Sequence, residues 1–387
     1  MISARNPMKD KVAIAGAATT GFTPHNTDRS PASYAAEACI RVMRDCGLKP
    51  SDINGLCGSA LPAATAQAML GIPEVTWFGN PSIPFASGIA AAASAVHSGL
   101  ADVVLAYHTP YRLPWNTANS LKDPFRRPQL QGVAGPPETT FGPIGYTAWA
   151  SRYMHAYGVP KEHFGYVALN GRANAALNPA AVMRAPLTMD AYLSARMIRW
   201  PLNLLDMDVP VDGADAFVIT TPERARDLKL PPVLIQAAVL GMIDRNEEDQ
   251  TPSLAEHGQR VVVDALKAKS DFWIDGADLY FPYDGFSFIT LSWLEAVGYC
   301  GRGEAGAFLA ANRDEASGRV LIDGRVPMNP HGGALSEGGT QGSGHFREAV
   351  HQLQGIAGAR QAPGARTALV TTGGMFFNAQ GVTLRRA

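Results

Sequence analysis

Residues 87–108 read SGIAAAASAVHSGLADVVLAYH, and this stretch decides the fold. Its first part is nearly all alanine, which predicts a helix with very small side chains. A helix this thin can lie between two sheets rather than on an outer surface, where a helix usually carries one polar face. Residues 101–108 follow as a continuous apolar run, typical of a strand that is buried on both faces. The stretch therefore predicts an α/β protein with a buried central helix.

The sequence before this stretch shows the same alternation of strand and helix. Residues 11–18 form a short apolar run, and residues 30–47 place apolar side chains at helical spacing. Ser30 or Ser33 can serve as the N-cap of that helix, and Gly47 follows its last turn. Strands separated by helices in this way predict a mostly parallel sheet covered on both faces.

Two features predict how the chain is divided. Residues 111–205 begin with a long segment rich in Pro, Gly and polar residues, typical of a lid or binding loop inserted into an α/β domain. A second unit begins near the pair Pro231-Pro232 and ends in a hairpin of strands. We therefore predict an N-terminal half over 1–230, with an inserted loop domain, and a C-terminal half over 231–387. Their like order indicates an internal duplication.

The composition excludes several classes of protein. The 387 residues are 46% hydrophobic and 17% charged, which is ample material for buried sheets and helices. The formal net charge of −1, with no run of Lys or Arg, argues against nucleic-acid binding. Neither a long apolar run nor a signal-peptide core is present, so we expect a cytoplasmic protein without a membrane span. The four cysteines are scattered, which predicts reduced thiols and no metal site.

Several segments carry a family resemblance. They are SGIAAAASAVHSGLADVVLAY (87–107), WPLNLLDMDVPVDGADAFVITTPERA (200–225), DLYFPYDGFSFITLSWLEAVGYCGRGEAG (278–306), MNPHGGALSEGGTQGSGHFREAVHQLQG (328–355) and ALVTTGG (368–374). Together they resemble the thiolase superfamily, in the branch of the sterol-carrier-type (lipid-transfer) thiolases, over nearly the whole chain. The resemblance implies the thiolase fold, in which two similar βαβ-type halves form a five-layered α-β-α-β-α sandwich. It also implies a homodimer.

The sequence departs from the thiolase pattern where thiolase chemistry takes place. The family has a nucleophilic cysteine at the start of the buried helix, whereas this chain reads PFASG and places Phe85 there. A phenyl ring cannot accept an acyl group. The family's Gly-His-Pro, whose histidine donates a hydrogen bond to the thioester oxygen, corresponds to GGT here, with Gly339 at the histidine position. Thr371 and Thr372 precede the last Gly-Gly, where many thiolases carry a second cysteine.

The stretch FPYDGF at 281–286 points to a different reaction. The sterol-carrier branch has His-Asp-Cys-Phe at this place, so Tyr283 stands at the position of a catalytic histidine. A phenol can give or take a proton when its surroundings shift its pKa from about 10. This replacement resembles the thiolase-like aldolases of steroid side-chain degradation, which cleave a β-hydroxyacyl-CoA by a retro-aldol reaction with a small OB-fold partner protein. Those aldolases commonly carry a second tyrosine where this chain has Gly339.

A retro-aldol site needs a base for the β-hydroxyl proton and hydrogen-bond donors for the enolate of the thioester. Tyr283 is the predicted base, with His331 or His345 assisting. Backbone amides of the glycine-rich segments are the predicted donors, at Gly332, Gly333, Gly339, Gly373 and Gly374. Coenzyme A enters as part of the substrate, and no separate cofactor is expected.

Other interpretations stay open for single residues. Asp284 can cap the helix that begins at Ser287, since Asp is a preferred N-cap. His331 can be a loop histidine satisfied by the backbone, and His345 can face solvent. Arg126 and Arg127, in the insert, are candidates for binding coenzyme A phosphates or are a solvated pair.

The function itself has two alternatives to a lyase. One is an acetyl-CoA acyltransferase with an unusual nucleophile, for which Cys57 is the nearest thiol in the sequence. The other is a non-catalytic acyl-CoA-binding subunit, whose partner supplies the chemistry. An OB-fold partner with a zinc ribbon fits the lyase and the binding subunit alike.

Overall fold

The computed structural model describes residues 3–25, 28–59, 61–81, 83–112, 143–244, 251–375 and 378–387. Two groups of strands lie side by side in it. The first group runs in the order β3 (Trp77–Gly79), β2 (Gly55–Ser59), β4 (Val103–His108), β7 (Asp212–Thr220) and β1 (Ala13–Thr23). The second runs in the order β8 (Val233–Gly241), β13 (Ala379–Arg386), β12 (Thr367–Thr372) and β9 (Leu279–Pro282). Two short ribbons lie outside these groups, β5 (Met197–Arg199) with β6 (Leu202–Asn203) and β10 (Leu321–Ile322) with β11 (Val326–Pro327).

Strand β1 joins the two groups into one nine-stranded sheet. It pairs with β7 along most of its length and with β8 through Ala13–Leu234 and Ile14–Val233. Parallel pairing is confined to β2 with β3 and β4, and to β9 with β12. The prediction of a mostly parallel sheet is wrong, because the middle strands β4, β7, β1, β8 and β13 pair antiparallel. The closing hairpin is confirmed as β12 and β13.

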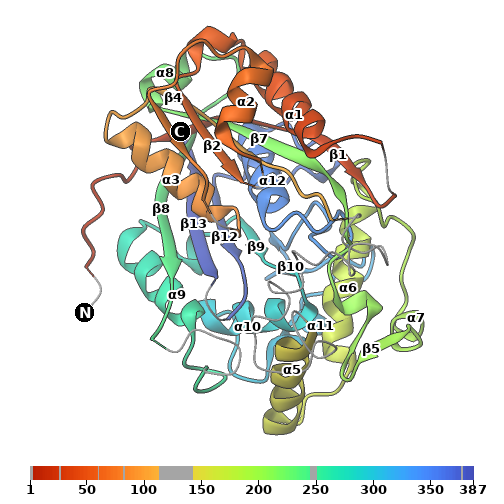
Figure 1. The fold of residues 1–387 in the computed structure, drawn as a ribbon. Helices are drawn as coiled ribbons and strands as arrows, with labels where there is room; N and C mark the ends of the chain where they lie inside the picture. Colours follow the sequence, from red (N-terminus) through yellow and green to blue (C-terminus); the bar gives the residue numbers. More distant parts are fainter. Residues whose placement is uncertain are drawn as a thin grey trace.

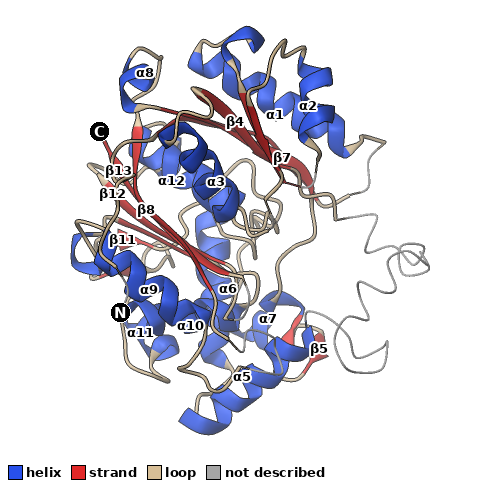
Figure 2. Ribbon diagram, turned by 60° about the vertical axis from the view of Figure 1, so that its left-hand side comes forward, coloured by secondary structure: helices blue, strands red, loops and turns tan. Residues whose placement is uncertain are grey.

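The helices form the other layers, as Figures 1 and 2 show. The outer layer on the first group contains α1 (Pro31–Cys46) and α2 (Ala63–Leu70), and α9 (Gly258–Lys269) and α10 (Ser287–Val297) cover the second. Between the two groups lie α3 (Ala86–His97) and α12 (Ser343–Gln354). The remaining helices are α5 (Pro143–Tyr157), α6 (Glu162–Ala175), α7 (Met189–Leu193), α8 (Pro222–Arg226) and α11 (Ala305–Ala311).

The alanine-rich helix α3 is the buried central helix that its composition predicts. Ile89 and Ala93 are fully buried, in one core with Phe217 of β7 and Ile235 of β8. Leu353 of α12 belongs to the same core. Small side chains let α3 fit between strands of both groups, because the distance between packed layers depends on side-chain size. The five layers are therefore confirmed.

Local signals set the ends of the helices where the sequence is explicit. Ser30 caps α1, since its side chain accepts a hydrogen bond from the amide of Ser33 at 3.2 Å. Gly47 ends the same helix with φ 80°, a left-handed conformation that favours glycine.

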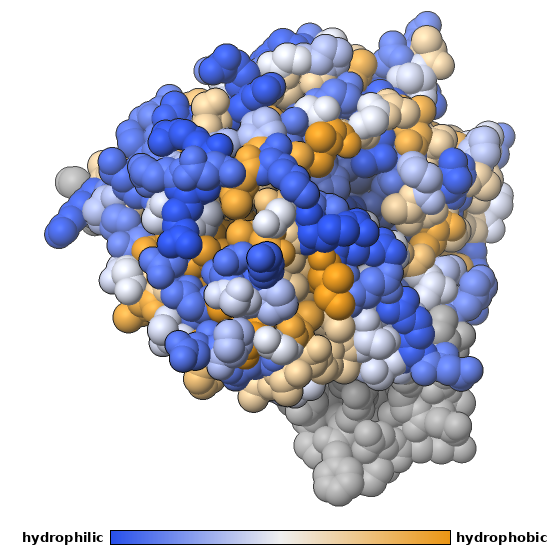
Figure 3. Space-filling view, turned by 90° about the horizontal axis from the view of Figure 1, so that it is seen from above, coloured by the Kyte–Doolittle hydropathy of each residue, from blue (hydrophilic) through white to orange (hydrophobic). Residues whose placement is uncertain are grey.

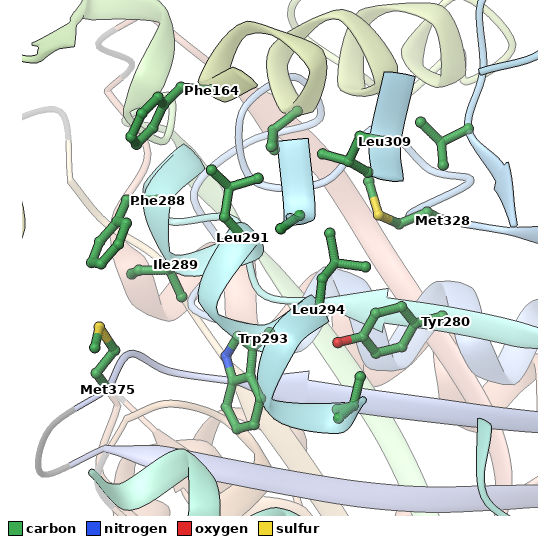
Figure 4. Close-up of a cluster of buried hydrophobic side chains, with 14 of the residues drawn as sticks. Phe164, Tyr280, Phe288, Ile289, Leu291, Trp293, Leu294, Leu309, Met328 and Met375 are labelled. Atoms are coloured by element: carbon green, nitrogen blue, oxygen red, sulfur yellow. The ribbon is translucent and has the colours of Figure 1, made fainter. Parts of the chain in front are cut away.

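Helix α10 is buried on nearly every side. Figure 4 shows Leu291, Trp293 and Leu294 of this helix among the side chains of one apolar cluster. Helices α5, α6 and α11 cover the face that would otherwise meet solvent. Trp293 also donates a hydrogen bond to the carbonyl of Gly373 at 2.9 Å, which ties α10 to the end of β12.

In the described part of the chain, no helix is both long and apolar enough to cross a membrane. Hydrophilic and apolar residues are interspersed on the face seen from above in Figure 3.

Candidate active site

Tyr283 stands just beyond the carboxyl end of β9, where its ring occupies the space beside a neighbouring glycine. Thr290 of α10 donates a hydrogen bond to the Tyr283 carbonyl at 3.1 Å. A Cβ built on Gly285 would come within 2.6 to 2.9 Å of the Tyr283 ring and its hydroxyl. The ring therefore folds back over Gly285, and any larger residue there would displace it. The side chain of Tyr283 is partly exposed.

Asp284 points away from α10 and binds the glycine-rich loop instead. Its carboxylate accepts hydrogen bonds from the amides of Ala334 at 2.8 Å and Leu335 at 3.2 Å. It also lies 3.0 Å from Nε2 of His345. The interpretation of Asp284 as a helix cap is wrong, because Phe286 stands at the cap position and no side chain caps α10. His345 is fully buried, so the interpretation that it faces solvent is wrong as well.

The three residues predicted as catalytic lie together. The His331 and His345 ring centres are 4.7 Å apart, and those of Tyr283 and His345 are 5.8 Å apart. An ionised carboxylate can only accept, so Nε2 of His345 donates to Asp284, and in the neutral ring Nδ1 is then the lone-pair acceptor. Within the described residues, that Nδ1 has no hydrogen-bond partner.

His331 is uncharged at neutral pH. Burial holds its pKa well below the usual range for histidine, and the neighbouring His345 and Arg347 lower it further. Its Nδ1 has no hydrogen-bond partner among the described residues, while its carbonyl accepts a hydrogen bond from Asn178 at 2.8 Å. The interpretation of a histidine satisfied by the backbone therefore does not account for the Nδ1 atom.

The glycine-rich loop before α12 is shaped around Asp284. Gly333 has φ 66°, and a Cβ there would overlap the Asp284 carboxylate. Arg347 of α12 anchors the loop through two buried ion pairs. One is with Glu337 of the loop, and the other, at 2.6 Å, is with Asp215 of β7.

Three of the five predicted oxyanion donors already have protein partners. The amide of Gly332 donates to the Asn329 carbonyl at 2.9 Å, and that of Gly339 donates to the Val209 carbonyl at 2.7 Å. The Gly374 amide donates to Oδ1 of Asn378 at 2.9 Å. Gly333 and Gly373 are therefore the better candidates among the five.

Phe85 faces the protein core. It lies at the start of α3 and is fully buried, with its ring stacked on Phe217 at 5.1 Å between centres. Phe346 and His108 complete its aromatic surroundings at 6.4 and 5.8 Å. Its amide donates to the Gln341 carbonyl at 3.0 Å, which holds the start of α3 against the glycine-rich loop. The Phe85 side chain thus contributes packing and no reactive group.

The four cysteines are shielded to different degrees. Cys39, Cys46 and Cys57 are buried, and Cys300 is half-buried. Burial raises the pKa of the Cys57 thiol to about 12, and its sulfur lies 3.4 Å from the Gly88 carbonyl. Since the thiolate is the nucleophilic form, this burial disfavours Cys57 as a nucleophile at neutral pH.

Two residues of the site were missed in the sequence, Arg112 and Asp208. They form an ion pair beside Gly339, and burial together with the Asp208 charge raises the pKa of Tyr283 well above that of a free phenol. Arg112 lies in no motif, and Asp208 lies in the segment 200–225, whose pattern assigns it no role, so only the folded chain brings them to Tyr283. Arg126 and Arg127 lie outside the described residues.

Comparison with known proteins identifies the family. Residues 244–386 match the family model described as thiolase C-terminal domain-like. The chain is 34% identical to 17-hydroxy-3-oxo-4-pregnene-20-carboxyl-CoA lyase of Mycobacterium tuberculosis, over 95% of this chain and 97% of that protein. The chain belongs to the thiolase superfamily. A second relative within the superfamily, the steroid side-chain-cleaving aldolase of Thermomonospora curvata, is 33% identical over 96% of this chain and 97% of its own length.

Solved structures of the thiolase superfamily agree with the fold. The Ltp2-ChsH2(DUF35) aldolase aligns with a TM-score of 0.85 at 31% identity, covering 98% of this chain and 99% of that chain. Human mitochondrial 3-ketoacyl-CoA thiolase aligns with a TM-score of 0.69 at 15% identity, which shows the shared fold alone. The predicted thiolase fold and the resemblance to thiolase-like aldolases are both confirmed.

Proposed function

We propose that this chain is a carbon–carbon lyase, which cleaves a β-hydroxyacyl-CoA with a steroid-like or branched acyl chain by a retro-aldol reaction. The observation that carries the proposal is a contrast between two places in the fold, the position of the thiolase nucleophile and the end of β9. A buried phenyl ring occupies the nucleophile position, while a tyrosine, two histidines and a carboxylate are gathered at the end of β9. Such a set can move protons, and it contains no thiol of the kind that forms the acyl-enzyme of a thiolase.

In the proposed reaction the β-hydroxyl proton leaves as the bond between Cα and Cβ breaks. The former hydroxyl carbon becomes a ketone, and the electron pair of the broken bond forms the enolate of the thioester, which then takes a proton at Cα. No oxidant or second substrate is consumed. The raised pKa of Tyr283 keeps its phenol protonated at neutral pH. We therefore assign Tyr283 to hold the β-hydroxyl oxygen and pass its proton on, with Nδ1 of His345 as the acceptor.

Asp284 and His331 support this transfer. Asp284 holds the His345 ring in the tautomer with a free Nδ1 and stabilises the imidazolium that forms. His331, neutral and in contact with His345, adds no positive charge that would oppose this proton transfer. General acid–base catalysis of this kind contributes about 10²–10⁴-fold to a rate.

We also infer a homodimer that works with an OB-fold partner. The name of the Ltp2-ChsH2(DUF35) aldolase joins a thiolase-like component to a DUF35 component, which supports a two-component assembly for this chain. The relatives named as lyase and aldolase support an enzyme rather than a non-catalytic binding subunit.

The test compares the wild-type chain, with and without a DUF35 protein, to its Tyr283→Phe variant. The substrate is 17-hydroxy-3-oxo-4-pregnene-20-carboxyl-CoA, which a retro-aldol cleavage would split into a 17-ketosteroid and propionyl-CoA. We expect cleavage by the wild type and a loss of about 10²-fold or more in kcat for Tyr283→Phe. Tyr299→Phe is the matched control, because the Tyr299 hydroxyl is buried without a hydrogen-bond partner among the described residues, outside the site.

Other results would point to the alternative functions. Binding of the acyl-CoA without cleavage, even with the partner present, would favour a binding subunit. A covalent acyl adduct in the intact mass after incubation with acetoacetyl-CoA would favour an acyltransferase.

A further inference from the structure

The ion pair of Arg112 and Asp208 lies where four segments of the chain meet. Asp208 is fixed beside Tyr283, because its amide donates to the Gly285 carbonyl at 3.0 Å and the Tyr283 ring lies over Gly285. Arg112 is fixed from the other side by its own amide, which donates to the Asp212 carboxylate at 2.8 Å. A backbone hydrogen bond thus holds each member of the pair, while the Arg112 side chain is 32% exposed.

The same pair occupies the space that Gly339 leaves open. A Cβ built on Gly339 would overlap the Arg112 guanidinium and lie 2.5 Å from Oδ2 of Asp208. The Gly339 amide donates to the Val209 carbonyl at 2.7 Å, which holds the glycine-rich loop against this segment. A side chain at position 339 would thus displace the Arg112 guanidinium from its place in this structure. Position 339 is the one at which the resemblance to thiolases implies a histidine that donates to the thioester oxygen.

We propose that Arg112 is a further catalytic residue, whose guanidinium donates a hydrogen bond to the thioester oxygen as the enolate forms. Asp208 is its positioning residue. The inference rests on the lyase function proposed above and names the donor that this function requires. A guanidinium presents several N–H donors in a fixed plane, so it can hold Asp208 and still donate to a second oxygen. Its charge stabilises an enolate more than a neutral thioester, which lowers the barrier to cleavage.

The experiment measures kcat and KM of the full chain, in its complex with a DUF35 protein, for 17-hydroxy-3-oxo-4-pregnene-20-carboxyl-CoA. A parallel measurement follows deuterium uptake at Cα of propionyl-CoA in D2O, which reports enolate formation without any cleavage. We expect Arg112→Gln to lower both kcat and the uptake rate by about 10²-fold or more, with KM changed by less than about threefold. Arg112→Lys, which keeps the charge but not the planar fork, should recover part of this loss.

Two further variants separate catalysis from folding. Arg302→Gln is the matched control, because Arg302 is exposed to a similar degree, at 34%, and pairs with Glu295 at 3.8 Å away from the site. Gly339→Ala keeps both members of the Arg112 pair but displaces the guanidinium, so it should reproduce the loss of kcat.

The possible outcomes are distinguishable. Unchanged kcat and uptake in Arg112→Gln would overturn the assignment, and so would a rise in KM alone, which would indicate ground-state binding of the coenzyme. If the wild type neither cleaves the substrate nor exchanges the Cα hydrogen, the lyase proposal itself fails, and the role of Arg112 fails with it.

Discussion

Replacing Asp284 by Asn tests how the site is held together. The carboxylate accepts from two backbone amides, at 2.8 and 3.2 Å, and lies 3.0 Å from Nε2 of His345. All three groups are donors, whereas an amide side chain has only one accepting atom. The NH2 group of the introduced asparagine would therefore face at least one buried N–H. An unsatisfied buried donor costs about 1–3 kcal/mol, and a hydrogen bond to a charged group contributes about 1.5–3 kcal/mol.

These magnitudes predict that Asp284→Asn lowers the free energy of unfolding by about 3 kcal/mol. The loss of activity should be larger than the loss of stability suggests. If the NH2 group of the new side chain donates to Nε2 of His345, the proton moves to Nδ1, and the proposed acceptor of the substrate proton is lost. We expect kcat to fall by about 10²–10⁴-fold under conditions where the variant is fully folded.

The assays are chemical denaturation and steady-state cleavage of the steroid acyl-CoA. Asp278→Asn is the control, because Asp278 also accepts from two backbone amides, of Arg366 at 2.8 Å and Thr367 at 3.1 Å, but lies near no histidine among the described residues. It should lose stability and keep kcat. A folded Asp284→Asn variant with the kcat of the wild type would refute the role of His345 as the base.

Three further perturbations have expected outcomes. Gly333→Ala should lose more stability in denaturation than Gly324→Ala, because both glycines have φ near 65° but only a Cβ at 333 meets a side chain; equal losses would contradict the packing described. Phe85→Ala should cost about 3–5 kcal/mol, as for other buried aromatic side chains, and a smaller loss in denaturation would show that the aromatic cluster can collapse. Burial lowers the pKa of His108 to about 4 in the folded chain. As the pH falls below 6.5, His108 is therefore protonated in the unfolded chain before it is protonated in the folded chain. Unfolding free energy should therefore drop by about 2 kcal/mol between pH 6.5 and 5 from this residue, and His108→Asn should flatten that part of the pH profile.

The sequence was enough to predict the layers but not the strand directions. The small side chains of α3 fix its place between the sheet groups, because few helices can fit there. Strand β7 pairs antiparallel with β1 and β4, both of which are far from it in the sequence, and periodicity does not report such pairing. Helix α10 carries polar residues that look solvent-facing, yet Gln259 accepts from Ser292, and Glu295 lies beside the hydroxyl of Tyr153. Buried partners of this kind are invisible until the chain is folded.

The candidate site was predicted in the same uneven way. Tyr283, His331 and His345 were predicted from motifs and lie together. Arg112 and Asp208 pair across 96 positions of the sequence, and Tyr283 lies another 75 positions beyond Asp208, so no local pattern predicts that these three residues meet. The role of Asp284 also needed the structure, since a preferred cap residue next to a helix start is normally its cap.

The burial of the cysteines has a consequence for how this protein meets oxidants and alkylating reagents. Enzymes that depend on a thiolate are stopped by iodoacetamide or hydrogen peroxide, because the same thiolate that attacks a substrate attacks the reagent. Here the half-buried Cys300 is the most accessible thiol, and burial raises its pKa to about 12. Cys300 follows the C-terminal end of α10, whereas Tyr283 precedes the N-terminal end of this helix. Treatment that inactivates a thiol-dependent relative should leave this chain active. The activity that remains after alkylation therefore distinguishes the two proteins in a mixture.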